Sequence, residues 1–92
     1  MDLGLKGRTA LVMGASQGLG QATAMQLAEE GAHVILVARR EDVLTSVQQQ
    51  IEDAGGSAEV ACCDLFDRAS RQALCQLIEN LLRLDVLVAN SG

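Results

Sequence analysis

The sequence has no proline, tryptophan or tyrosine, and Phe66 is its only aromatic residue. A single aromatic ring leaves no stacking platform of the kind that single-strand-binding proteins use. Seven basic residues stand against twelve acidic ones, a formal net charge of −5, which opposes attraction to nucleic-acid phosphates or to an anionic membrane surface. We therefore expect neither nucleic acid nor membrane among the partners of this chain.

Long apolar runs and targeting segments are also missing. No stretch approaches the roughly 20 apolar residues of a membrane helix, and residues 1–8 have neither a signal-peptide nor a transit-peptide pattern. The three cysteines form no C-x-x-C pair and His33 is the only histidine, which argues against structural zinc. We interpret the cysteines as small apolar residues in a reducing compartment and predict a cytoplasmic protein without a metal site.

What is present is the composition of one small globular domain, with 49% apolar and 21% charged residues among 92. Apolar runs at residues 9–13 and 33–38 are typical of strands buried on both faces, and residues 57–63 and 85–89 read as a third and a fourth strand. Helices are predicted between them, over residues 18–30, over a segment ending at Gly55-Gly56, and after an N-cap at Asp67. The second helix carries its apolar stripe at Val43, Leu44, Val47, Ile51 and Ala54.

The predicted element order is therefore βαβαβαβ. Strands that alternate with helices of this length pair in parallel through right-handed crossovers, and the helices cover both faces of the sheet. We predict a doubly wound α/β fold with the strand order 3-2-1-4.

A glycine-rich loop joins the first predicted strand to the first predicted helix. At this place backbone amides and the helix dipole form a ready site for a pyrophosphate. Gly14 permits a tight exit from the strand, Gly18 a close approach of the backbone to phosphates, and Gly20 close packing of the helix on the sheet. The spacing is G-x-x-x-G-x-G, which differs from the general dinucleotide fingerprint. The candidate phosphate-binding residues are Gly14, Ser16, Gln17, Gly18, Leu19 and Gly20.

In this strand-loop-helix context the loop resembles the T-G-x-x-x-G-x-G loop of short-chain dehydrogenases/reductases, a family with a Rossmann-type fold. Met13 departs from the usual threonine, which removes a hydroxyl that braces the loop and no phosphate donor. The resemblance covers essentially the whole chain and implies a nicotinamide dinucleotide as cofactor.

Two later segments extend the resemblance. Asp64 and Leu65 are similar to the acidic turn that contacts the adenine ring. Residues 89–92, Ala-Asn-Ser-Gly, are similar to the N-N-A-G motif, which would place Asn90 beside the ribose and nicotinamide end of the cofactor. Taken singly, Asp64 could equally be a helix or turn cap and Asn90 a turn residue at a strand end.

The end of the second predicted strand bears on the choice of cofactor. Ala38 stands where NAD-dependent relatives carry an aspartate for the ribose hydroxyls, and Arg39 and Arg40 follow, where a basic side chain would neutralise the 2′-phosphate of NADP. We expect NADP, with NAD the less favoured cofactor. The alternative is that both arginines are solvated charges at a helix start, offset by Glu41 and Asp42.

The family's catalytic machinery, a serine with a Y-x-x-x-K helix, has no counterpart in this sequence. The chain contains no tyrosine, and Lys6 is its only lysine. We therefore assign no catalytic residue and predict that the 92-residue chain alone is inactive. Residues 86–88 would also form an open apolar edge. We expect residues 1–92 to be a dinucleotide-binding half-domain, truncated before the catalytic half.

By this resemblance the parent protein is an NADP-dependent oxidoreductase acting on a small alcohol or ketone, most similar to 3-oxoacyl-[acyl-carrier-protein] reductases, which act on an acyl thioester. The full-length form would be a homo-oligomer. Two alternatives stay open, a non-catalytic nucleotide-binding module and an inactive remnant.

Overall fold

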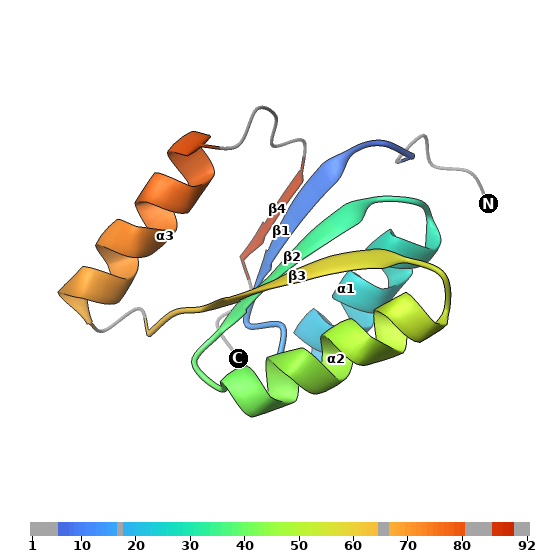
Figure 1. Ribbon diagram of the computed structural model, residues 1–92, viewed down its shortest axis with the longest axis horizontal. Coiled ribbons are helices and arrows are strands. Elements are labelled where there is room, and N and C mark those ends of the chain that lie inside the picture. Colours follow the sequence, from blue (N-terminus) through green and yellow to red (C-terminus); the bar gives the residue numbers. More distant parts are fainter. Residues whose placement is uncertain (1–5, 17, 65–66, 81–85, 90–92) are drawn as a thin grey trace.

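The computed structural model describes residues 6–16, 18–64, 67–80 and 86–89 (Figure 1). Strands and helices alternate along the described chain, as the sequence predicts. They are β1 (Thr9–Met13), α1 (Gly18–Glu29), β2 (His33–Ala38), α2 (Glu41–Asp53), β3 (Ser57–Cys62), α3 (Arg68–Asn80) and β4 (Val86–Ala89). All pairings are parallel, in the order β3-β2-β1-β4. The predicted doubly wound α/β fold is confirmed.

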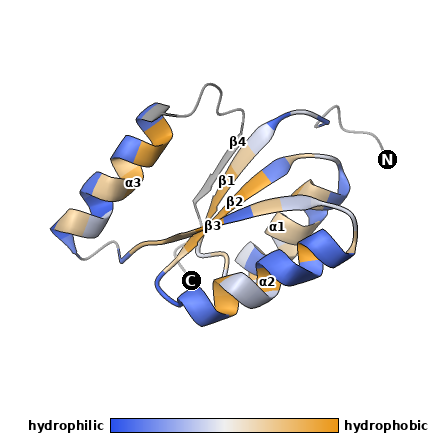
Figure 2. Cartoon of the chain, in the orientation of Figure 1, coloured by the Kyte–Doolittle hydropathy of each residue, from blue (hydrophilic) through white to orange (hydrophobic). Residues whose placement is uncertain are grey.

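The helices lie on both faces of the sheet, α1 and α2 on one and α3 on the other (Figure 1). The alternation of side chains along each strand divides the core accordingly. In β2, Val34 and Leu36 belong to the cluster under α1 and α2, whereas Ile35 and Val37 belong to the cluster under α3. Coloured by hydropathy, β2 is largely hydrophobic and α2 is hydrophilic along much of its length (Figure 2). This double burial explains why β1 and β2 read as continuous apolar runs, whereas β3 has Ser57, Glu59 and Cys62 exposed.

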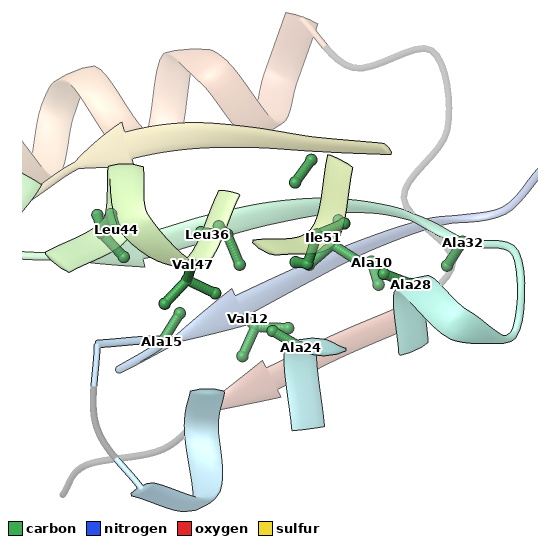
Figure 3. Close-up of a cluster of buried hydrophobic side chains, with 12 residues drawn as sticks. Ala10, Val12, Ala15, Ala24, Ala28, Ala32, Leu36, Leu44, Val47 and Ile51 are labelled. Carbon is green, nitrogen blue, oxygen red and sulfur yellow. The ribbon is translucent and has the colours of Figure 1, made fainter. Parts of the chain in front are cut away.

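Small residues let α1 lie close to the sheet. Gly20, Ala24 and Ala28 are buried at four-residue spacing, and Ala24 and Ala28 pack in the same cluster as Val12 of β1 (Figure 3). Leu19, next to Gly20 in the helix, has 74% of its surface exposed. The face of α1 that meets the sheet is therefore the glycine and alanine stripe.

The predicted stripe of α2 is buried at Leu44, Val47 and Ile51, all of which pack in the cluster under α1 and α2 (Figure 3). Val43 is partly buried against this cluster. The prediction is wrong at Ala54, which is exposed because the helix ends at Asp53 and Ala54 is its C-cap.

The third helix begins at the predicted cap. The backbone N–H of Ser70 donates a hydrogen bond to Oδ2 of Asp67 at 3.1 Å, three residues into the helix. Other boundaries differ from the prediction by one residue, since α1 ends at Glu29 and β3 at Cys62. The predicted first residue of the fourth strand, Asp85, is outside the described residues.

Gly31, between α1 and β2, should be hard to replace. Its φ of +99° lies in the left-handed region, and a Cβ there would come within 3.0 Å of the Lys6 Cα. We expect Gly31→Ala to lower the free energy of unfolding by about 2–3 kcal/mol, from strain plus displacement of the Lys6 backbone. Gly55→Ala is the matched control, because φ is +91° there with nothing within 4 Å of the added carbon; its cost should be about 1 kcal/mol. Equal losses in urea unfolding would contradict the role of Lys6.

Candidate functional site

The segments that carry the predicted site residues leave the carboxyl ends of three neighbouring strands. In a parallel sheet these ends lie at one edge, where ligands of doubly wound proteins bind. The glycine loop follows β1, the turn with the two arginines follows β2, and Asp64 follows β3 (Figure 1). The strand order places β2 between the other two.

The first half of the glycine loop is anchored inside the protein. Gly14 has a φ of +72°, which the exit from β1 requires. The N–H groups of Gly14 and Ala15 both donate to the carbonyl oxygen of Val37 in β2, at 2.8 and 3.2 Å. Ala15 is fully buried. These two amides are therefore engaged by the protein itself.

The second half of the loop opens toward the surface. Gly18, with a φ of +26°, begins α1 and is exposed, and an added Cβ would find nothing within 4 Å. Leu19 is also exposed, Ser16 is partly buried and Gly20 is buried. Gln17 is outside the described residues. The loop is thus fixed inside the protein at Gly14 and Ala15, and it leads to an exposed helix N-terminus at Gly18.

The turn after β2 presents its two arginines differently. Both are exposed, but Nη2 of Arg40 donates to Oδ2 of Asp42 at 3.2 Å, and this hydrogen bond holds the pKa of the Asp42 carboxyl below its usual value. Among the described residues the Arg39 guanidinium has no ion-pair partner. The alternative that an acidic neighbour offsets the arginine charge therefore holds for Arg40. Arg39 carries the positive charge of this turn that no described acidic group offsets.

Three consecutive carbonyl groups, those of the last two residues of β2 and of Arg39 directly after it, accept hydrogen bonds from the segments on either side. Val37 accepts from the glycine loop, and Ala38 accepts from the backbone N–H of Cys63 at 2.8 Å. The carbonyl of Arg39 accepts from Sγ of Cys62 at 3.1 Å. No pattern in the sequence indicates this last contact, because the register that pairs Ala38 with Cys62 is seen only in the folded sheet.

The segment after β3 is tied into a turn before α3. The carbonyl of Asp64 accepts from the N–H of Asp67 at 3.0 Å, and Asp64 is partly buried. The side chain of Asp67 caps α3 by accepting from the N–H of Ser70. Burial and, secondarily, the Asp64 carboxylate raise the pKa of the Cys63 thiol. Two further predicted residues, Leu65 and Asn90, are outside the described residues.

In the described ranges no three His, Cys, Asp or Glu side chains gather so that they could hold a metal ion. No helix in this same part of the chain combines the length and the apolar character needed to cross a bilayer.

The parallel sheet, its strand order and the glycine loop after the first strand define a Rossmann-type α/β unit. Residues 8–92 match the family model of the short chain dehydrogenases, so this chain belongs to the short-chain dehydrogenase/reductase family.

Named relatives and solved structures match nearly all of this chain. A fatty acyl-CoA reductase of Acinetobacter baylyi is 42% identical over 89 residues, which are 96% of this chain and 30% of that protein. A metagenomic short-chain oxidoreductase solved with NADP is 42% identical with a TM-score of 0.87, over 96% of this chain and 40% of its own. A 3-oxoacyl-(acyl-carrier-protein) reductase of Agrobacterium tumefaciens, solved with NADP, is 41% identical with a TM-score of 0.84, over 96% and 34%. The chain thus spans about a third of the length of these relatives.

Proposed function

We propose that this chain is the NADP-binding portion of a short-chain oxidoreductase that transfers hydride between the nicotinamide and an alcohol or ketone. Residues 1–92 would form the dinucleotide-binding half-domain, and the catalytic half would be elsewhere. The observation that carries the choice of cofactor is the Arg39 guanidinium, which has no ion-pair partner among the described residues and directly follows the strand that anchors the glycine loop.

The glycine loop fits a pyrophosphate. Because the amides of Gly14 and Ala15 already donate to Val37, the donors left for an anion are those from Ser16 onward, at the start of α1. The open space at Gly18 allows phosphate oxygens to approach the backbone, which a side chain there would obstruct. Gln17 and Leu19 would complete the contact along this segment.

The end of β2 fits a 2′-phosphate better than a free ribose diol. A guanidinium binds phosphate through charge-assisted hydrogen bonds, and Ala38 offers no carboxylate to the ribose hydroxyls. Arg40 would contribute less because Asp42 already holds it. Asp64 and Leu65 would lie along the adenine, and Asn90 near the nicotinamide end.

The bound nicotinamide would supply the hydride acceptor or donor. The residues of this chain would bind and orient the cofactor, and none is assigned a proton-transfer role, since tyrosine is absent and Lys6 precedes β1. We therefore propose that the 92-residue chain alone does not turn over substrate.

An acyl thioester is our more specific proposal for the substrate. Two of the relatives are named for such substrates, the fatty acyl-CoA reductase and the 3-oxoacyl-(acyl-carrier-protein) reductase. We propose a homo-oligomer for the full-length form and the cytoplasm as its compartment, consistent with the free thiols of all three cysteines.

Titration of the chain with NADPH and with NADH, followed by calorimetry, tests the proposed function. We expect saturable 1:1 binding of NADPH, with at least about tenfold weaker binding of NADH, because one phosphate–guanidinium contact is lost, worth roughly 1.5–3 kcal/mol. Tighter binding of NADH would overturn the choice of cofactor. Binding of neither dinucleotide to a folded chain would overturn the proposed function.

A further inference from the structure

Of the three carbonyls that tie the end of β2 to its neighbours, only one depends on a side chain. Val37 and Ala38 accept from backbone amides, which every residue except proline provides. The Arg39 carbonyl accepts from the Cys62 thiol at 3.1 Å. This third tether is therefore the one that a substitution can remove without altering the sheet.

Little else fixes the main chain of the Arg39 turn. Arg40 is the N-cap residue of α2, yet its side chain makes no capping hydrogen bond. The carbonyl of Arg40 accepts from the N–H of Leu44 at 3.1 Å, which holds the helix side of the turn. On the strand side, the Cys62 thiol holds the peptide group that joins Arg39 to Arg40.

We propose that Cys62 is a positioning residue for Arg39, and that its thiol helps to set the preference of this site for a 2′-phosphorylated adenosine. The inference rests on the proposed function. Fixing the peptide group after Arg39 limits the directions in which its side chain leaves the turn, so less conformational freedom is lost when the guanidinium meets a phosphate. A ligand without the 2′-phosphate would gain nothing from this tether.

Three variants separate the hydrogen bond from the volume of the side chain. Cys62→Ala removes the donor, Cys62→Ser keeps a donor of similar size, and Cys62→Val fills the space without a donor. Cys75→Ala is the matched control, an exposed cysteine on α3. Thermal unfolding of each variant shows that the chain is folded.

The probes are 2′,5′-ADP and 5′-AMP, which differ in the 2′-phosphate and contain no nicotinamide. We expect Cys62→Ala and Cys62→Val to bind 2′,5′-ADP roughly two- to fivefold more weakly, the range for one modest hydrogen bond. Affinity for 5′-AMP should be unchanged, Cys62→Ser should restore the wild-type preference, and Cys75→Ala should have no effect. The Arg40 amide nitrogen, bonded to the accepting carbonyl, should shift in NMR spectra of the ligand-free alanine variant and return in the serine variant.

Other outcomes overturn the inference. If the affinities for both probes fall equally, Cys62 has a merely structural role. If the alanine and valine variants keep wild-type affinities, Cys62 has no role in binding. The wild-type titration separates this failure from that of the proposed function. If the wild type binds 2′,5′-ADP no better than 5′-AMP, the choice of NADP fails and the inference fails with it. If the wild type discriminates and Cys62→Ala discriminates equally, only the inference fails.

Discussion

Replacement of Arg39 by alanine should weaken NADPH binding by about ten- to a hundredfold while NADH affinity stays within about twofold. The reason is that the guanidinium of Arg39 has no ion-pair partner among the described residues and is free to meet the 2′-phosphate. A charge-assisted contact of this kind contributes roughly 1.5–3 kcal/mol. Calorimetric titration of both dinucleotides into the folded variant measures the effect.

Arg40→Ala is the matched control, because it removes the same charge one residue away. The Arg40 guanidinium is already bonded to Asp42 at 3.2 Å, so its loss should weaken NADPH binding by less than about threefold. Repeating both titrations at high salt should reduce the Arg39 effect, since exposed charges are screened. Equal losses from the two substitutions would show a diffuse electrostatic attraction and contradict the assignment of Arg39.

Leu36→Ala should be the most damaging of the substitutions considered for stability. Leu36 is fully buried at the centre of the sheet, and truncation would leave a cavity among Val12, Val47 and other members of its cluster (Figure 3). We expect the free energy of unfolding to fall by about 3 kcal/mol. For a chain of this size that is a large share of the total, which is on the order of 5–10 kcal/mol.

Leu19→Ala tests the same chemical change at an exposed position. Because 74% of Leu19 is exposed, its truncation should change the free energy of unfolding by less than about 0.5 kcal/mol. Urea unfolding followed by circular dichroism compares the two variants at equal m-values. A loss from Leu19→Ala as large as that from Leu36→Ala would mean that the described core does not determine stability.

The sequence was sufficient for the fold because each local signal agreed with the next. Strands buried on both faces read as apolar runs, and glycine and aspartate marked the helix ends at Gly31 and Asp67. The segments of the candidate site could be placed at one sheet edge for the same reason, since parallel pairing brings the carboxyl ends of strands together.

What the sequence could not predict depends on side-chain direction and on contacts between strands. Glu41 and Asp42 were equal candidates to offset the two arginines, and only the geometry selects the pair of Arg40 with Asp42. The contact between Cys62 and Arg39 joins residues far apart in the chain, so no local pattern contains it. Ala54 was placed on the helix stripe because periodicity continues past a helix end that backbone geometry determines.

The glycine loop and the end of β3 are hydrogen-bonded to successive carbonyl groups of β2. This arrangement limits how far apart the two segments can lie. The loop is held at Val37, and Arg39 is two residues further along the same strand end. In the proposed function, the segment that binds the pyrophosphate and the turn that carries Arg39 would therefore be attached to the same short strand end. A ligand with two phosphate groups at a matching separation would contact the loop and Arg39 at once. A ligand with a different separation would contact only one of them.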